Sequence, residues 1–232
     1  MTPESTLHSW SVTPKQAVTI QRELAPRIIR RGRPRHPNLL AGVDLAFLSD
    51  PKQSVSRPCR CVAGVVVWDV EAQAVVEQHV VRRAVRFPYV PGLLSFREAP
   101  AILAVLRKLR CAPDAFLFDG QGFAHPRRFG LACHVGLLID RPSLGCAKSL
   151  LIGTCRTPGV KKGSTSPIEH HGERIGVALR TRDRVKPIYV SVGHRLCLES
   201  SVEIALRACT RYRIPEPTRL ADKLVAEAKR SI

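Results

Sequence analysis

Three acidic side chains occur in surroundings where a charge is costly unless it is paired or binds a metal. Asp44 lies inside the apolar run 39–47, and Asp119 closes a shorter apolar run. Glu98 directly precedes a helix predicted over 99–110. A lone aspartate in such a position more often ends a strand or caps a turn. Three carboxylates on one sheet edge would repel one another, and a divalent cation that prefers oxygen ligands, such as Mg²⁺, would relieve that repulsion.

The segment DGQGFAHPRRF, which begins at Asp119, adds groups that can meet a phosphate. Its glycines, Gly120 and Gly122, allow a backbone or a flat ligand to approach closely. A histidine and two arginines follow, and arginine binds phosphate through paired donors. The competing interpretation is an ordinary loop histidine beside a solvated arginine pair. The candidate phosphate-binding side chains are Arg127 and Arg128, and His125 is a further candidate beside them.

Two further side chains are candidates for contacts with nucleic acid. Tyr89 lies between two prolines that hold it in a stiff, extended segment, so it can stack on a base or wedge into a duplex. A packed surface loop is the plainer interpretation. Lys148 lies in a sequence like the tail of a phosphate-binding P-loop, but Pro142 and Ala147 stand where that motif needs glycine. Lys148 is therefore retained only as a single cation directed at phosphate.

The pattern of apolar residues predicts an α/β fold whose sheet positions these side chains. Three strand-like runs follow one another closely in the first half, which favours an antiparallel meander. The second half alternates helical and strand-like segments, so we expect one mixed sheet with helices packed on it. The predicted strands are 39–47, 62–70, 74–81, 115–118, 143–146, 174–180 and 187–192, and the predicted helices are 99–110, 129–139, 198–209 and 218–229.

The length favours a single domain over residues 1–232. Its core is predicted over about 14–230, and residues 1–13 are expected to be flexible. A chain of this size can bury a sufficient core without disulfides. The segments 30–37 and 154–171 combine turn residues and charge without periodicity, so we interpret both as exposed loops.

Charge is the most unusual feature of the composition. Lys and Arg total 37 and Asp and Glu total 19, which gives a formal net charge of +18 and points to a polyanionic partner. The sequence has no apolar run of about 18 residues that would indicate a membrane span. Residues 1–10 lack a secretory signal pattern. The eight cysteines are scattered without a CxxC pair, so we expect reduced thiols in a cytoplasmic protein.

Several of these segments belong to a larger set of sequence blocks. The blocks are AGVDLAF at 41–47, FPYVPGLLSFRE at 87–98, DGQGFAHPRRFGLACHVGLLID at 119–140, PSLGCAKSLL at 142–151, VSVGHRL at 190–196 and RIPEPTRLAD at 213–222. In this order they resemble the endonuclease V family, and their joint match is far more specific than any one block. The chain has PYVP where the family has PYIP, which is a volume-conserving change. Residues 153–172 match no block.

The resemblance implies a ribonuclease H-like fold, which agrees with the mixed sheet predicted above. It also implies a Mg²⁺-dependent nuclease, with Mn²⁺ as a substitute, that acts in the repair of deaminated purines. Such an enzyme nicks DNA at the second phosphodiester bond 3′ to deoxyinosine. The target base must leave the helix to be inspected, and extrusion costs less where pairing is already weak.

The resemblance further implies roles for individual residues. The catalytic set consists of Asp44, Glu98, Asp119, His125 and Lys148. Its three acids match the metal-binding positions, and its histidine and lysine match positions near the scissile phosphate. Tyr89 matches a wedge that fills the space left by the flipped base. The residues that match the pocket for that base are Gly92, Leu94, Gly120 and Gly122. His194 lies in a matching block, but no role follows for it.

Two other functions stay open at this point. The first is an inosine-specific endoribonuclease, because family members differ in their preference between deoxyinosine in DNA and inosine in RNA. The second is a non-catalytic basic protein that binds nucleic acid. The presence of all three acids argues against this second alternative. We expect the protein to be a monomer with no membrane association.

Overall fold

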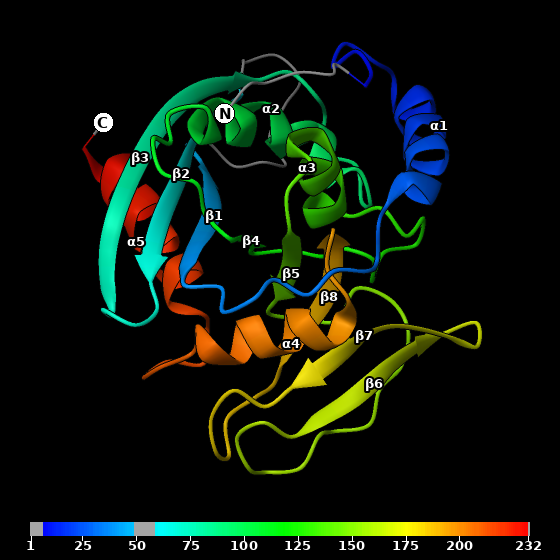
Figure 1. Ribbon diagram of the computed structural model, residues 1–232. Helices are drawn as coiled ribbons and strands as arrows, with labels where there is room; N and C mark the ends of the chain where they lie inside the picture. Colours follow the sequence, from blue (N-terminus) through cyan, green and yellow to red (C-terminus); the bar gives the residue numbers. More distant parts are fainter. Residues whose placement is uncertain (1–6, 49–58, 232) are drawn as a thin grey trace.

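An eight-stranded mixed sheet in the order β3-β2-β1-β4-β5-β8-β7-β6 runs through the molecule (Figure 1). The computed structural model describes residues 7–48 and 59–231. The described strands are β1 (Leu39–Phe47), β2 (Cys59–Asp69), β3 (Ala74–Val85), β4 (Ala115–Phe118), β5 (Ser143–Ala147), β6 (Thr165–His170), β7 (Glu173–Leu179) and β8 (Ile188–His194). The predicted α/β class with one mixed sheet is confirmed.

The centre of the sheet is parallel, and both of its flanks are antiparallel. β4 pairs in parallel with β1 on one side and with β5 on the other. β2 and β3 extend the β1 side as the predicted antiparallel meander. β8, β7 and β6 follow β5 in antiparallel order. Because β1 and β4 are parallel neighbours, the residues that follow β4 emerge beside the second half of β1.

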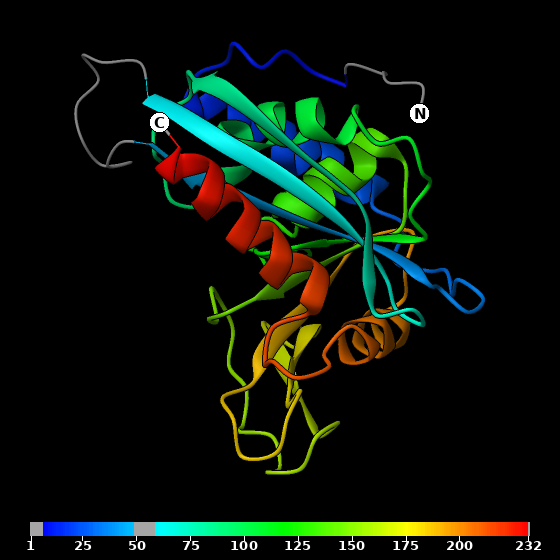
Figure 2. The same ribbon diagram turned by 90° about the vertical axis from the view of Figure 1, so that its left-hand side faces the viewer.

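Helices cover both faces of this sheet. They are α1 (Pro14–Leu24), α2 (Leu94–Leu106), α3 (Leu131–Ile139), α4 (Leu198–Arg207) and α5 (Glu216–Arg230), with a short 3₁₀ helix, η1, at Ala25–Arg27. α2 and α3 pack on the face that carries Val43 and Val65, where Ile102 and Val135 share one apolar cluster with them. α5 lies along the opposite face of β1 and β2 (Figure 2), and its Val225 contacts Gly64.

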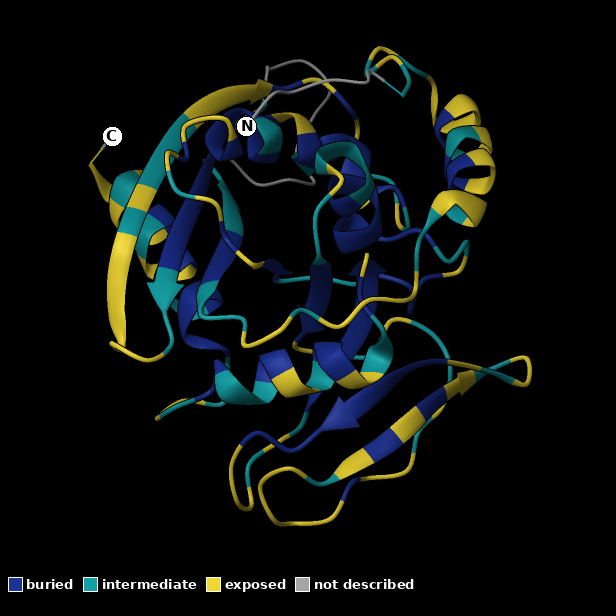
Figure 3. Ribbon diagram, viewed as in Figure 1, coloured by how far each residue is buried: buried dark blue, intermediate teal, exposed yellow. Residues whose placement is uncertain are grey.

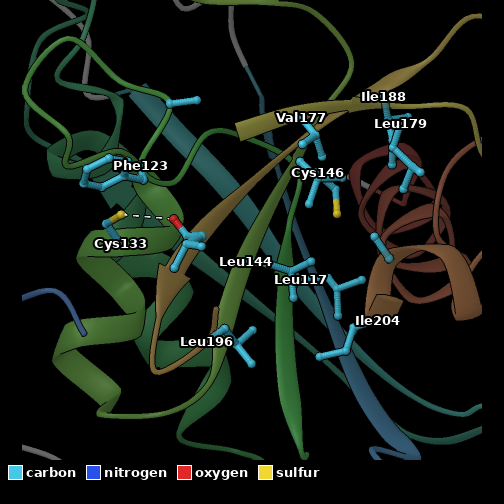
Figure 4. Packing of buried hydrophobic residues seen from close by; sticks show 14 of the residues in the cluster. Leu117, Phe123, Cys133, Leu144, Cys146, Val177, Leu179, Ile188, Leu196 and Ile204 are labelled. Atoms are coloured by element: carbon cyan, nitrogen blue, oxygen red, sulfur yellow. Dashed lines mark hydrogen bonds between the residues drawn. The ribbon is translucent and has the colours of Figure 1, made fainter. Parts of the chain in front are cut away.

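The second half of the sheet has its own apolar cluster. Leu117, Leu144 and Val177 from three strands pack with Ile204 of α4 (Figure 4). The central strands are buried, whereas the outer strands β3 and β6 carry exposed segments (Figure 3). No helix among the described residues is long and apolar enough to span a bilayer.

The structure corrects the bounds of the predicted helix 99–110. This helix, α2, begins at Leu94 and ends at Leu106, so Glu98 lies within it rather than before it. Proline is common in the first turn of a helix, so Pro100 favours a start near residue 99. In the structure, helical bonding is already established by residue 96, whose N–H donates to the carbonyl of Leu93.

Two elements were missed by the periodicity argument. Residues 14–24 form α1, which Thr13 caps by accepting from the N–H of Gln16 while its own N–H donates to the Gln16 side chain. The segment 154–171, interpreted as an exposed loop, contains the strand β6. β6 is an edge strand with alternating burial, and its proline is tolerated there because an edge leaves some N–H positions unpaired.

The described part of the N-terminal segment packs against the core. Residues 1–6 of the segment expected to be flexible lie outside the described residues. His8 Nε2 lies 2.7 Å from Nε2 of the buried His134, and the Trp10 ring stacks on His134 with a centroid distance of 5.3 Å. Residues 7–12 therefore extend the packing around α2 and α3.

Candidate active site

Strand register brings two of the predicted acids together. Val43 of β1 pairs with Phe118 of β4 in the parallel ladder. Asp44 and Asp119 are the next residues along each strand, so they lie side by side where neighbouring strands are about 4.8 Å apart. The sheet thereby places these two carboxylates as the sequence led us to expect.

Glu98 joins the two aspartates from helix α2, and the electrostatics show how close the group is. Burial, together with the charges of Asp119 and Asp222, raises the pKa of Asp44 to about 7. Burial, together with the charges of Asp44 and Asp119, raises the pKa of Glu98 to about 8. The three acids singled out in the sequence therefore form one mutually repelling cluster.

Asp222 of α5 is a fourth acid at this site, and sequence reasoning missed it. It is exposed, and its charge raises the pKa values of both Asp44 and Lys148. The available signal was its place at the end of the block RIPEPTRLAD. A single acid on the polar face of an amphipathic helix looks like a solvated residue, and only the packing of α5 on β1 brings it to the site.

Lys148 completes the charged cluster. It follows the end of β5, and its Nζ lies 2.5 Å from Oδ2 of Asp119. Burial acts to lower the pKa of Lys148, but the hydrogen bond to Asp119 and the charges of Asp119, Asp222 and Asp44 raise it overall. Lys148 is therefore a firmly charged ammonium beside the acids, and its side chain is 50% exposed.

The chemistry of these side chains fits a hard divalent cation. Carboxylate oxygens are the protein ligands that Mg²⁺ prefers, and burial together with mutual repulsion raises the pKa values of Asp44 and Glu98, which a bound cation would oppose. Among the described residues, no three His, Cys, Asp or Glu side chains already converge closely enough to hold a metal. The ion pair with Lys148 draws the Asp119 carboxylate to itself, so metal binding requires that carboxylate to be shared or released.

A cavity of about 350 Å³ adjoins the acid cluster. Asp119 and Lys148 belong to the charged cluster and also line the cavity, so an occupant of the cavity would lie next to the charged groups. Tyr89 and Leu94 are exposed and lie at this cavity, together with exposed Leu151. The predicted site residues that line it are Tyr89, Gly92, Leu94, Asp119, Gly120, His125 and Lys148.

Gly122 does not line this cavity. Its N–H donates to Ser191 Oγ at 2.9 Å, and a Cβ at this position would lie 2.1 Å from the Val192 carbonyl oxygen. The absence of a side chain therefore allows the loop to contact β8, which holds the neighbouring Gly120 in place.

His125 lies beside the cavity and is held by backbone contacts. It is buried, its Nε2 is 3.0 Å from the Gly92 carbonyl, and its Nδ1 accepts from the Arg127 N–H at 3.2 Å. Burial and the charges of Arg127 and Arg128 lower its pKa to about 4. His125 is therefore a neutral imidazole that carries its proton on Nε2 and donates to Gly92.

The guanidinium groups of Arg127 and Arg128 are engaged within the protein. Arg127 donates to the carbonyl of Gly92 and to the side chain of Gln21. Arg128 donates to Glu173 at 2.8 Å. The phosphate-binding role assigned to both arginines stays a prediction, because both guanidinium groups donate to protein groups in this structure.

His194 does not line the cavity. His194 is buried with its Nε2 3.1 Å from Asp140 Oδ1, and its Nδ1 accepts from the Ile29 N–H. It thus links the segment after η1 to the end of α3. None of the eight cysteines forms a disulfide, and four of them are buried.

Comparison with known proteins identifies close relatives. The sequence model of the family described as Endonuclease V matches residues 22–223. Endonuclease V from Gloeobacter violaceus is 48% identical over 239 aligned positions, which cover 99% of this chain and 94% of the relative. The crystal structure of Endonuclease V from Streptomyces avermitilis has a TM-score of 0.87 at 41% identity and covers 96% of both chains.

A more distant relative was crystallised with nucleic acid. Endonuclease V from Ciona intestinalis, in complex with a 23mer DNA containing an inosine followed by a ribo-adenosine, has a TM-score of 0.81 at 28% identity. The match covers 95% of this chain and 99% of that one. These likenesses extend over nearly the whole chain and confirm the ribonuclease H-like fold. The acids of this chain cluster beside a pocket. By its sequence and its fold, the chain belongs to the Endonuclease V family of nucleases.

Proposed function

We propose that this enzyme is a Mg²⁺-dependent endonuclease that nicks DNA at the second phosphodiester bond 3′ to deoxyinosine. The observation that carries the proposal is the shared wall between the cavity and the acid cluster, because Asp119 and Lys148 belong to both. A base bound in the cavity would hold its own strand across the acids. The DNA in the Ciona intestinalis complex, which contains an inosine, supports this choice of base.

Different residues at the site serve cleavage and recognition, and the acids with Lys148 serve cleavage. Asp44, Glu98 and Asp119 would hold Mg²⁺ with Asp222 nearby, and bound Mg²⁺ would supply a polarised phosphate and an activated water. Mn²⁺, which also accepts oxygen ligands, is expected to substitute. Lys148, released from Asp119, offsets negative charge that develops on the phosphate.

Recognition requires the base to leave the duplex. Tyr89, which is 50% exposed, can fill the space that the extruded base leaves. Extrusion costs a few kcal/mol and less at a weak pair, so hypoxanthine is favoured before any contact in the pocket. A base in the cavity would lie against Gly92 and Gly120, which have no side chains to keep it from the backbone. The charge of +18 attracts DNA of any sequence.

A gel-based nicking assay tests the proposal. It compares matched strands of inosine-containing DNA, undamaged DNA and inosine-containing RNA, each with Mg²⁺, with Mn²⁺ and with a chelator. We expect metal-dependent cuts only in inosine strands, one bond beyond the nearest 3′ phosphodiester. Binding without cleavage in every lane would contradict the proposal and favour a binding protein.

An inosine-specific endoribonuclease is the second candidate. The observation that favours it is the ribo-adenosine that follows the inosine in the Ciona intestinalis complex. A preference for RNA in the same assay would establish this alternative. We expect the enzyme to be cytoplasmic and to act as a monomer, and sedimentation of the purified protein would test the oligomeric state.

A further inference from the structure

Gln21 connects two walls of the cavity from a helix that none of the sequence blocks includes. It lies in α1, and only 1% of its surface is exposed. Its Nε2 donates to the carbonyls of Gly92 and Phe129, each at 3.1 Å. Its Oε1 accepts from Nε of Arg127 at 2.5 Å. The whole amide of this side chain is thus occupied by groups from two separate loops.

The first of these groups is the carbonyl at the base of the Tyr89 loop. The Leu93 N–H donates to the Val90 carbonyl, and Gly92 has φ +76°, so the turn has proline and glycine at its two centre positions. The Gly92 carbonyl accepts from Gln21, from His125 at 3.0 Å and from Arg127 at 2.6 Å. Three donors from two other segments therefore fix this turn.

The second group belongs to another segment of the cavity lining. Phe129, whose carbonyl accepts from Gln21, directly precedes Gly130 and Leu131, and both of these line the cavity. The Gly130 N–H donates to the Gly122 carbonyl at 3.0 Å, which ties this wall to the loop of Asp119. One amide nitrogen thereby joins two segments that line the cavity.

We propose that Gln21 is a positioning residue that sets the width of the base pocket, and thereby the selectivity for hypoxanthine. The inference rests on the proposed function of that pocket. Readout by backbone groups requires walls fixed to within about 0.5 Å, since a looser wall loses hydrogen bonds to the base. Gln21 itself lines the cavity, but its three amide contacts are all with protein groups, so it acts on a bound base through the segments at Gly92 and Phe129.

Two substitutions separate positioning from packing. Gln21→Met keeps the side-chain volume and removes all three hydrogen bonds. Gln21→Glu keeps the acceptor for Arg127 but cannot donate to Gly92 or Phe129. Thr19→Ala, on the exposed part of the same helix, is the matched control. If wall spacing matters, both Gln21 variants lose selectivity, whereas the control keeps it.

The measurements are nicking kinetics and base extrusion. We expect the kcat/KM for inosine DNA to fall about tenfold to a hundredfold in both Gln21 variants, since the lining segments at Gly92 and Phe129 are no longer held together. A 2-aminopurine placed beside the inosine should fluoresce less when a Gln21 variant binds the DNA than when the wild-type enzyme binds it. Affinity for undamaged DNA should stay within about twofold of wild type, because the basic surface is unchanged.

The outcomes distinguish this inference from the proposed function. If the wild-type enzyme does not prefer inosine, the proposed function fails. If the wild type prefers inosine and folded Gln21→Met keeps the same preference and fluorescence, the positioning role is wrong. Should Gln21→Met fail to fold by circular dichroism, Gln21→Glu, which retains the Arg127 contact, decides the question by the same two measurements.

Discussion

The carboxyl group of Asp44 illustrates how function costs stability at a single residue. Its pKa in the folded chain is about 7, against a usual value of 3.8, so the native state binds this proton more tightly than the unfolded state does. Stability of the metal-free protein therefore falls as the pH rises from about 4 to about 8. Glu98, with a pKa of about 8, adds to the same trend.

The substitution Asp44→Asn should therefore stabilise the metal-free protein while ending its activity. We expect a gain of about 1–3 kcal/mol at pH 8 that disappears near pH 4, measured by urea unfolding with chelator. Nicking should fall about a thousandfold because metal binding contributes several kcal/mol to the barrier. DNA binding should persist. Equal stability of the two proteins at pH 8 would count against the repelling cluster, and the exposed Glu227→Gln serves as the control.

Tyr89 provides a second test at this scale. Tyr89→Ala removes the exposed ring at the cavity but leaves the turn at Gly92 and its three donors in place. We expect inosine-specific binding to fall by about 1–3 kcal/mol, which is typical of a lost base–aromatic contact. Affinity for undamaged DNA should change little. Equal weakening on both kinds of DNA, measured by fluorescence anisotropy, would make Tyr89 a general binding residue instead.

At the scale of elements, the sequence predicted those helices and strands that are determined by their own local pattern of apolar residues. The apolar run of β1, the β-branched run of β2 and the apolar run of α3 agree with the structure because these segments are buried over consecutive residues, which selects continuous apolar sequence. β6 was missed because its alternation covers only two buried residues, Ser166 and Ile168.

The candidate site shows the same division between local pattern and tertiary contact. Asp44 and Asp119 could be predicted because each interrupts an apolar run beside a strand. Asp222 and Gln21 could not, since each lies on a helix whose packing, rather than its own sequence pattern, directs it to the site. The phosphate-binding role of Arg127 and Arg128 stays a prediction, and their contacts with Gln21 and Glu173, which are distant in sequence, could not be predicted either.

The capping box of α1 permits a prediction about the helix that carries Gln21. Thr13→Ala removes the acceptor for the Gln16 N–H, and a lost cap costs about 1 kcal/mol. We expect the melting temperature to fall by about 2–4 °C, with Thr19→Ala as the comparison. Scanning calorimetry measures the shift. An unchanged melting temperature would mean that α1 is held by its packed face alone.

At the scale of the whole molecule, the charge of +18 and the neutral pocket should respond differently to salt. Binding to undamaged DNA should weaken about a thousandfold between 50 and 200 mM NaCl, as for a protein that neutralises at least about six phosphates. The ratio of inosine to undamaged affinity should change much less, because the pocket walls are mostly uncharged. If charge also contributed to selectivity, titrations at four salt concentrations would show the ratio of inosine to undamaged affinity falling together with the affinity for undamaged DNA.

The two outermost strands of the sheet have a consequence for how these molecules behave when crowded. Unpaired strand edges are templates on which a second chain can add, and open sheets are exposed to this hazard at both ends. β3 carries the exposed arginines Arg82 and Arg83, which would repel the same strand of another copy. β6 carries Pro167, which lacks an N–H to donate. Both borders of the sheet thus resist the edge-to-edge growth that leads to fibres, even where many copies gather along one DNA.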